Sequence, residues 1–279
     1  MVETITAEQL RDMIDADEEF VLFDTRSPDS FEDWHIDGAE NVEYSGDADE
    51  LVGEFDEDAI GAGDTVVTIC ATGNSASSFA EYLEREGDAH DVKTVEGGME
   101  AWSMVYDVVP IATENDDLVV LQLQRRSKGC LGYVVGSKRA GEAALVDVTR
   151  ATDEFLDAAR AHGLKVTHIL DTHIHADHIS KGRELADRLG VPYHLGAPAA
   201  TRDPDFEFDP IEPNAVVELG DVDIKAVHTP GHTTGMTSYL VDDEALLTGD
   251  TLFVESIGRT ELQFADKDAR DGARVQYET

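Results

Sequence analysis

The chain has 279 residues, of which 41% are hydrophobic, so it is long enough for two domains that each bury a core. It contains no run of 18 apolar residues, which argues against a membrane helix, and its N-terminus lacks the basic and apolar segments of a secretory signal. There are 60 acidic and 21 basic residues, for a net charge of −39. Nothing in the sequence resembles a basic stripe, which argues against nucleic-acid binding.

The acidic charge is uneven along the chain. Up to residue 116 there are 32 acidic and 4 basic residues, and beyond it there are 28 and 17. One interpretation is an acidic arm that imitates nucleic acid or binds a basic partner. The acids are, however, spread through regular hydrophobic patterns, and lysine is scarce. We therefore favour a solvated, halophile-like surface suited to a salt-rich cytosol.

Cysteine usage indicates a reducing compartment. The two cysteines, Cys70 and Cys130, fall in different halves of the chain. They form neither a disulfide framework nor a CxxC zinc pair. The sequence therefore predicts a cytoplasmic protein.

The first half alternates short apolar runs with helical patterns. Strands are predicted at residues 20–26, 64–70 and 91–97. A helix is predicted at 77–87, where the apolar residues recur on one helical face. Strand–helix–strand order predicts a parallel α/β sheet. A proline followed by polar residues without a period marks a boundary near 107–117.

The second half has the pattern of a β-rich α/β domain. Helices are predicted at residues 152–162 and 181–190. Strands are predicted at residues 118–124, 130–137, 143–149, 166–173, 216–219, 222–228, 237–241 and 244–248. The strand at 166–173 runs directly into a histidine-rich segment, which is the clearest chemical feature of the sequence.

That segment reads THIHADH over residues 172–178. Alternate residues of an extended chain share one face, so His173 and His175 can reach the same ion. Two further patterns follow later strands, PGH ending in His232 and TGD ending in Asp250. Imidazole and carboxylate ligands suit zinc or iron, and chance assembly of these patterns at strand ends is improbable. The sequence predicts a metal site built around the following residues: His173, His175, Asp177, His178, His232 and Asp250.

Residues 118–264 resemble the metallo-β-lactamase superfamily, specifically its branch of glyoxalase II and persulfide dioxygenases. The resemblance rests on THIHADHIS and on GRTELQ at 258–263, for which persulfide dioxygenases usually have GRTDFQ. It implies an αββα sandwich with one Fe(II) held by His173, His232 and Asp250. It also implies that His175, Asp177 and His178 orient these ligands or hold a second metal. Arg259 would pair with a substrate carboxylate.

Glyoxalase II is the nearest alternative within the same resemblance. It implies a two-zinc thioester hydrolase with a bridging water, and its second metal needs a histidine nearer the C-terminus. No histidine follows His232, which favours a mononuclear site. The family normally continues beyond the point where this chain stops, so we expect a C-terminally shortened sandwich. In that case the histidine is also absent because the chain stops before the position at which the family carries it.

Cys70 ends an apolar run and is followed by Ala71, Thr72, Gly73, Asn74 and Ser75, and then by a predicted helix. A thiol at such a junction faces backbone N–H groups and a helix N-terminus, and both stabilise a thiolate. The alternative is an inert buried cysteine, which is common at strand ends.

The surroundings of Cys70 favour the catalytic interpretation. The segments FDTR (23–26), WHIDGA (34–39), the cysteine loop and EGGMEAW (96–102) together resemble a single-domain rhodanese over residues 4–106. The resemblance implies a sulfurtransferase that carries a persulfide on Cys70. Active loops of that family often read CRSGNRS, whereas Ala71 and Ser75 stand here in place of the arginines. The N–H groups of residues 71–75 could still hold a persulfide or an anion, but the substitution argues against thiosulfate as donor.

The sequence therefore predicts an α/β protein with a rhodanese-like domain at 1–107, a linker at 108–117 and a metallo-β-lactamase-like domain at 118–279. Our main hypothesis is a thiol-persulfide dioxygenase that converts persulfide and O₂ to sulfite and thiol, coupled to sulfur transfer. Fe(II) is the favoured cofactor and Zn(II) the alternative. The competing hypotheses are a zinc hydroxyacyl-thiol hydrolase and a non-catalytic sulfur-relay protein. We expect a small thiol persulfide or thioester as substrate and no nucleic-acid or membrane partner. The sequence is compatible with a homo-oligomer.

Overall fold

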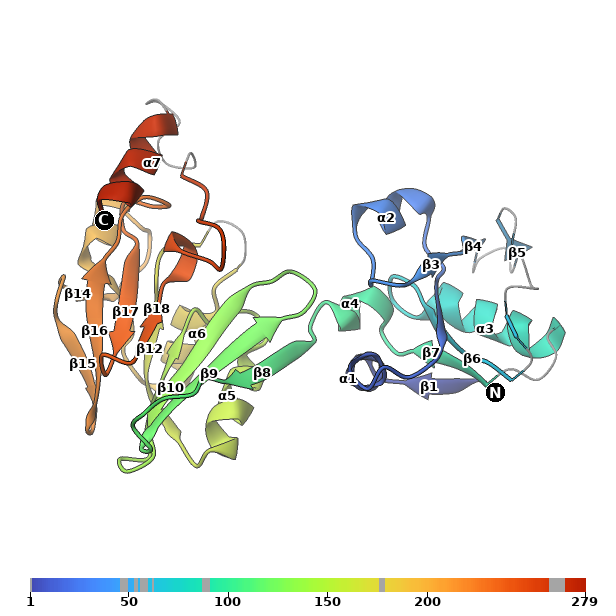
Figure 1. Cartoon of the computed structure of the whole chain (residues 1–279), viewed down its shortest axis with the longest axis horizontal. Coiled ribbons are helices and arrows are strands. Elements are labelled where there is room, and N and C mark those ends of the chain that lie inside the picture. Colours follow the sequence, from blue (N-terminus) through green and yellow to red (C-terminus); the bar gives the residue numbers. More distant parts are fainter. Residues whose placement is uncertain are drawn as a thin grey trace. The chain divides into compact units, whose positions relative to one another are not determined.

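The computed structural model describes residues 2–45, 50–52, 55, 60–61, 63–86, 91–175, 179–260 and 269–279. The chain divides into two compact units (Figure 1). The first comprises Met1–Val105 with Arg125–Gly129, and the second comprises Tyr106–Gln124 with Cys130–Thr279. The region for which the sequence predicts a linker, 108–117, begins inside a strand of the second unit. No helix in the described part of the chain is long and apolar enough to cross a bilayer.

The first unit is built on a parallel sheet, as its strand–helix–strand order predicts. The sheet order is β1-β7-β6-β2-β3, and every pairing in it is parallel. Its strands are β1 (Glu3–Ile5), β2 (Val21–Asp24), β3 (Glu40–Asn41), β6 (Thr65–Ile69) and β7 (Asp91–Val95). A separate antiparallel pair joins β4 (Tyr44–Ser45) to β5 (Glu50–Leu51). The helices are α1 (Ala7–Asp15), α2 (Pro28–Asp33), α3 (Asn74–Glu86) and α4 (Gly98–Trp102).

Helices cover both faces of this sheet because its strands are apolar on both sides. Successive residues of a strand point to opposite faces, and Val66 and Val67 accordingly belong to different clusters. On one face Val66 packs with Phe79 of α3. On the other face Val67 packs with Leu10 of α1 and Trp102 of α4. Both faces being buried explains why the strands read as continuous apolar runs.

The second unit contains two sheets. The larger has the order β14-β13-β12-β11-β10-β9-β8, and the smaller is antiparallel in the order β15-β16-β17-β18. The strands of the larger sheet are β8 (Tyr106–Pro110), β9 (Leu118–Arg125), β10 (Leu131–Ser137), β11 (Glu142–Val146), β12 (Lys165–Asp171), β13 (Tyr193–Gly196) and β14 (Asp209–Ile211). Those of the smaller sheet are β15 (Val216–Leu219), β16 (Val222–His228), β17 (Thr237–Val241) and β18 (Ala245–Leu247). The helices are α5 (Thr152–Ala161), α6 (Gly182–Leu189) and α7 (Ala269–Glu278), with 3-10 turns at Ala197–Arg202 and Gly249–Thr251.

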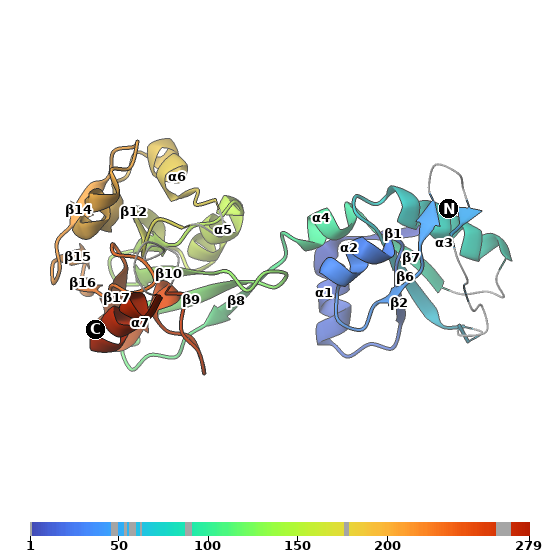
Figure 2. The ribbon, with the colours of Figure 1, turned by 90° about the horizontal axis from the view of Figure 1, so that it is seen from above.

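The two sheets are stacked over one apolar core. Val120, Val146 and Leu170 of the larger sheet pack with side chains of the smaller sheet that include Ile224 and Tyr239. Figure 2 shows α5 and α6 on the side of the larger sheet that faces away from β16 and β17. The α/β fold class and the stacked sheets expected from the sequence are thus confirmed.

A buried hydrogen bond links the two sheets beside the histidine-rich segment. Tyr239 of β17 is fully buried, and its hydroxyl donates to the backbone carbonyl of Asp171 at the end of β12, at 3.0 Å. Thr237 at the start of β17 adds a backbone N–H bond to the carbonyl of Thr172, at 2.9 Å. These two bonds hold the end of β12 against the smaller sheet.

We expect Tyr239→Phe to lower the free energy of unfolding of the second unit by about 1–3 kcal/mol, because a buried acceptor loses its donor. Urea unfolding of the full chain in high salt measures the change. Tyr277→Phe is the matched control, since Tyr277 is 91% exposed, and it should change stability by less than about 0.5 kcal/mol. Equal stability of both variants would show that the bond between the sheets contributes nothing.

Candidate functional site

Three predicted metal ligands converge at one edge of the stacked sheets. His173 follows β12, His232 follows β16, and Asp250 follows β18. Each offers one ligand atom, and the three atoms lie within 4.8 Å of one another. His173 and His232 are buried, whereas the Asp250 side chain is 32% exposed. The Nε2 atom of His232 lies 3.4 Å from a carboxylate oxygen of Asp250.

Hydrogen bonds set which nitrogen of each neutral imidazole carries the proton. Nδ1 of His232 lies 2.7 Å from the backbone carbonyl of Arg259, which can only accept. Nδ1 of His173 lies 2.9 Å from the hydroxyl of Thr172, and that hydroxyl already donates to the carboxylate of Asp147. Both rings therefore donate through Nδ1 and carry a lone pair on Nε2. Two such imidazoles with one carboxylate are a donor set that fits a divalent transition metal.

His175 lies in a second group of side chains, with Asp147 and Asp171. Its Nε2 is 3.2 Å from Asp147, and its side chain is 5% exposed. This arrangement leaves Nδ1 as the nitrogen of His175 that can accept or bind a metal. Asp177 and His178, which the sequence also predicts for the site, lie outside the described residues.

Asp147 organises this group although sequence reasoning assigned it no role. The carboxylate is buried and accepts from the backbone N–H of Thr172 at 2.7 Å as well as from the Thr172 hydroxyl. Burial by itself would raise the pKa of Asp147, but His175, His173 and the Thr172 bond outweigh it and hold the pKa below the ordinary range. The sequence contains a signal for this role. Asp147 directly follows β11 and Thr172 directly follows β12, and because these strands are parallel neighbours, both residues lie at the same edge of the sheet.

Asp171 differs from Asp147 in its environment. Burial raises the pKa of its carboxyl, and hydrogen bonds from Ser180 at 2.6 Å and Tyr193 at 2.7 Å offset only part of that effect. The same burial raises the pKa of Tyr193 far above its ordinary value. Asp171 therefore ties β12 to β13 and to the start of α6 beneath the metal-ligand cluster.

The segment around Arg259 contributes to the site through its backbone. Gly258 is buried, and a Cβ at that position would lie 1.9 Å from the carbonyl oxygen of Asp250. This close approach explains the glycine in the predicted GRTELQ motif. The Arg259 carbonyl orients His232, while residue 259 as a whole is exposed. Residues 261–263 of the motif lie outside the described part of the chain.

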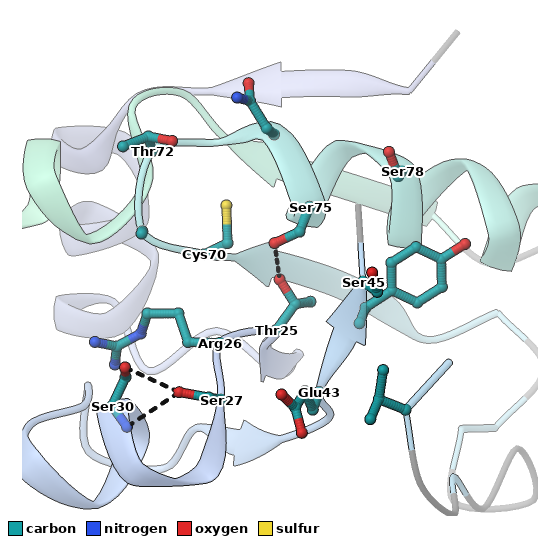
Figure 3. A pocket seen from close by; sticks show the side chains of 14 residues that line it. Thr25, Arg26, Ser27, Ser30, Glu43, Ser45, Cys70, Thr72, Ser75 and Ser78 are labelled. Atoms are coloured by element: carbon teal, nitrogen blue, oxygen red, sulfur yellow. Dashed lines mark hydrogen bonds between the residues drawn. The ribbon is translucent and has the colours of Figure 1, made fainter. Parts of the chain in front are cut away.

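The second candidate site is a pocket of about 540 Å³ around Cys70 in the first unit. Cys70 is buried, and the backbone N–H of Gly73 donates to its Sγ at 3.0 Å. Figure 3 shows Cys70 beneath the loop that carries Thr72, with Ser75 bonded to Thr25 on the opposite side. Residues 71–73 of the predicted loop thus curve over the thiol, whereas Asn74 and Ser75 already belong to the first turn of α3, which begins earlier than the sequence predicts.

A glycine allows this loop to approach α4. Gly98 has a φ of +56°, and a Cβ there would lie 2.2 Å from the carbonyl oxygen of Cys70. That carbonyl accepts from Met99 N–H at 2.7 Å, and the carbonyl of Ala71 accepts from Glu100 N–H at 3.0 Å. Because α4 binds these carbonyls, the loop's N–H groups can turn towards the sulfur.

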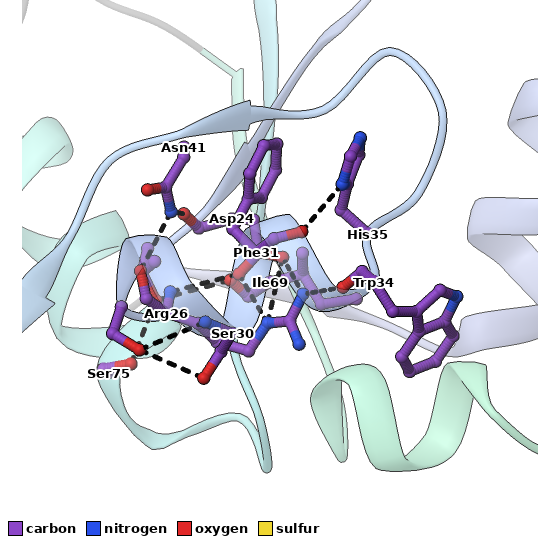
Figure 4. A network of polar contacts seen from close by, with 11 residues as sticks. Asp24, Arg26, Ser30, Phe31, Trp34, His35, Asn41, Ile69 and Ser75 are labelled. Carbon is purple, nitrogen blue, oxygen red and sulfur yellow. Dashed lines mark hydrogen bonds and ion pairs between the residues drawn. The ribbon is translucent and has the colours of Figure 1, made fainter.

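Asp24 and Arg26 form a structural ion pair at the edge of the pocket. The guanidinium Nε and Nη2 of Arg26 donate to the fully buried carboxylate of Asp24 at distances of 2.6–3.0 Å (Figure 4). Nη2 also donates to the carbonyl of Trp34 at 2.6 Å. The Nε and Nη2 donors of Arg26 therefore bind protein groups rather than a ligand in the cavity.

Comparisons with known proteins identify a domain family in each half of the chain. A model of the metallo-beta-lactamase superfamily matches residues 128–277, and a model of the rhodanese-like domain matches residues 6–104. The first of these spans more than half of the chain. The protein therefore belongs to the metallo-β-lactamase superfamily. Within it, this chain carries a rhodanese-like domain ahead of the metallo-β-lactamase domain.

Relatives match about half of this chain and only part of their own length. A protein named as a probable metallo-hydrolase from Burkholderia pseudomallei is 29% identical over 178 residues, which cover 50% of this chain and 60% of that protein. A hydroxyacylglutathione hydrolase from Rhodospirillum rubrum is 34% identical over 128 residues, which cover 46% and 49%. A metallo-beta-lactamase structure from Staphylococcus aureus is 26% identical with a TM-score of 0.54, covering 58% of this chain and 51% of that one. The chain thus spans 49–60% of these proteins.

We expect Thr172→Val to weaken metal binding by about 10- to 100-fold, because the hydroxyl that orients His173 and bonds to Asp147 is lost. Competition for zinc or ferrous ion with a chromophoric chelator measures the affinity. Thr167→Val, a substitution of the same kind inside β12, is the control and should bind as the wild type does. Unchanged affinity of the Thr172 variant would mean that the imidazole of His173 does not depend on this bond.

Proposed function

We propose that the protein is a thiol-persulfide dioxygenase whose rhodanese-like domain carries sulfane sulfur on Cys70. The observation that carries the proposal is the cluster of two histidines and one carboxylate, His173, His232 and Asp250. This ligand set is typical of mononuclear non-haem iron oxygenases, which keep coordination positions open. The presence of a cysteine pocket in the same chain supports a persulfide as the shared intermediate.

The residues of this chain have distinct roles in the proposed reaction. His173, His232 and Asp250 would hold one Fe(II), which when bound supplies the chemistry that activates O₂ towards a persulfide. Thr172 and the Arg259 carbonyl keep the two imidazoles in the tautomer that binds through Nε2. The buried position of both histidines keeps bulk water from their ring nitrogens.

The proposed reaction balances without a further reductant. A persulfide R–S–SH, one O₂ and one water yield the thiol R–SH, sulfite and two protons. The outer sulfur is oxidised, both atoms of O₂ are reduced, and the sulfur–sulfur bond breaks with the inner sulfur leaving as thiol. In the first unit, the Cys70 thiolate would accept only a sulfur atom, so that step needs no oxidant.

A zinc-dependent thioester hydrolase is the second candidate. It is favoured by the hydroxyacylglutathione hydrolase relatives, which include one from Rhodospirillum rubrum at 34% identity. A two-metal site would draw on His175 as well as on Asp177 and His178. The two candidates differ in bound metal, in oxygen consumption and in substrate.

The metal role is tested by oxygen uptake. The full chain, purified in high salt and loaded anaerobically with Fe(II), should consume O₂ when given a small-thiol persulfide. We expect His232→Ala to reduce uptake at least about 100-fold, because one of three ligands is lost. His162→Ala is the matched control, since His162 is an exposed histidine beyond α5. Two bound zinc ions with thioester hydrolysis and no oxygen uptake would favour the hydrolase instead.

The sulfur-carrier role is tested separately with Cys70→Ser. This variant should lose sulfur transfer, because no thiolate remains in the pocket, yet it should retain oxygen uptake on a supplied persulfide. Persulfide on the protein is measured by intact mass, and Cys130→Ser serves as the control that keeps Cys70. Sulfur transfer that persists in Cys70→Ser would refute the role given to this residue.

A further inference from the structure

Few charged groups line the Cys70 pocket, and they differ in whether a neighbouring protein group pairs with them. The cavity of about 540 Å³ is walled mainly by small hydroxyl side chains. Among them are Thr25, Ser27, Ser30, Thr72, Ser75 and Ser78. Two charged residues join this lining, Arg26 and Glu43. The character of the pocket therefore depends on what these two charges do.

The charge of Arg26 is compensated within the protein. Its guanidinium makes a forked ion pair with Asp24, whose side chain is fully buried, and the closest contact is 2.6 Å. The Arg26 side chain itself is only 12% exposed. A paired, hydrogen-bonded cation and anion present little net field to a ligand beside them. Arg26 consequently replaces neither of the loop arginines whose positions Ala71 and Ser75 occupy.

The charge of Glu43 is not compensated in the same way. Glu43 lies between β3 and β4, and its backbone carbonyl accepts from Val52 N–H at 2.9 Å. Figure 3 shows its carboxylate on the same side of the cavity as Ser27 and Thr25, below Cys70. Among the described residues, none of the ion pairs found involves Glu43. One negative charge thus remains in the wall of a pocket that otherwise offers hydroxyl groups.

The sequence around the pocket adds no cation. The first 105 residues contain four basic residues, Arg11, Arg26, Arg85 and Lys93. In the described structure, Arg11 is paired with Asp12, and Lys93 with Glu3 and Asp91. Arg85 lies over the ring of Tyr82 in α3. None of these three is part of the pocket lining, and neither are the basic residues of the segment 125–129 that belongs to the same unit, Arg125, Arg126 and Lys128.

We infer that this pocket selects a sulfane-sulfur donor whose carrier thiol is neutral or cationic, and that Glu43 is the residue that discriminates against anionic donors. The inference rests on the sulfur-carrier role proposed for Cys70 and names the substrate class of that site. An ammonium group on the donor can pair with the Glu43 carboxylate. A carboxylate or sulfonate on the donor meets a like charge in a partly enclosed cavity, where repulsion is stronger than in bulk water.

The transfer step itself requires no cation in the wall. The Cys70 thiolate attacks the outer sulfur of R–S–SH, the donor's sulfur–sulfur bond breaks, and a new bond forms to Cys70. The donor leaves as the thiolate R–S⁻, and Cys70 carries –S–SH, so atoms and electrons balance. The backbone N–H of Gly73, whose nitrogen lies 3.0 Å from Sγ, can donate to the sulfur of Cys70 when it bears the charge.

The test uses three donors that differ in charge and share their chemistry. They are the persulfides of 3-mercaptopropionate, 2-mercaptoethanol and cysteamine, which are anionic, neutral and cationic away from the sulfur. Single-turnover loading of Cys70 in the full chain is followed by intact mass, with Cys70→Ser to subtract loading on Cys130. We expect the cationic donor to load fastest and the anionic donor slowest. The preference should shrink as ionic strength rises, because salt screens the charge at the pocket.

Glu43→Gln identifies the residue responsible. We expect it to raise the ratio of anionic to cationic loading rates by about tenfold, since a charged wall changes local ligand concentration by such factors. Glu8→Gln is the matched control, because Glu8 is an exposed acid on α1 outside the pocket. Equal rates for the three donors, or an unchanged ratio in Glu43→Gln, would overturn the inference while leaving the sulfur-carrier role intact. Absence of persulfide on Cys70 with every donor would instead overturn the role proposed for Cys70.

Discussion

The stacking of two sheets over one apolar core is the constraint on which the metal-ligand cluster depends. His173 follows a strand of the larger sheet, whereas His232 and Asp250 follow strands of the smaller one. Nothing local in the sequence brings these three together. The apolar side chains between the sheets do so, and the bond from Tyr239 to Asp171 connects the sheets directly at the end of β12. The relative positions of the three metal ligands therefore follow from the packing of the apolar core between the two sheets.

Buried polar groups then convert this position into a defined orientation. Asp147 accepts from Thr172, and Thr172 in turn accepts from His173, so one carboxylate sets the tautomer of a ligand without touching the cluster. The Arg259 carbonyl does the same for His232. A buried carboxylate is stable only when its donors are in place, so the network that satisfies Asp147 also restricts the imidazole. Orientation of the ligands and stability of the fold thus share the same hydrogen bonds.

In the first unit, backbone groups rather than side chains determine the surroundings of the functional atom, the sulfur of Cys70. Its cysteine loop has no arginine, and the carbonyls of Cys70 and Ala71 are bound by the start of α4 across the glycine at position 98. The backbone N–H of Gly73 then donates a hydrogen bond to the sulfur of Cys70. With Arg26 committed to Asp24, the field in the pocket comes from hydroxyl dipoles and Glu43. Such an environment suits a soft, polarisable sulfur anion on a carrier without negative charge.

The sequence by itself determined the fold class, the central strands and helices such as β2, β6, β12, α3 and α5, and the residue types of both sites, because these depend on local periodicity and short motifs. Burial on both faces made β6 a continuous apolar run, and the spacing of THIH placed two histidines beside one strand end. Only the tertiary structure decided that Asp147 orients His173, that the Arg259 carbonyl binds His232, and that Glu43 lines the same pocket as Cys70. These relations join residues that are 26 or 27 positions apart or lie on separate strands. Their distances depend on how strands pair and sheets stack, and a one-dimensional pattern carries no record of that.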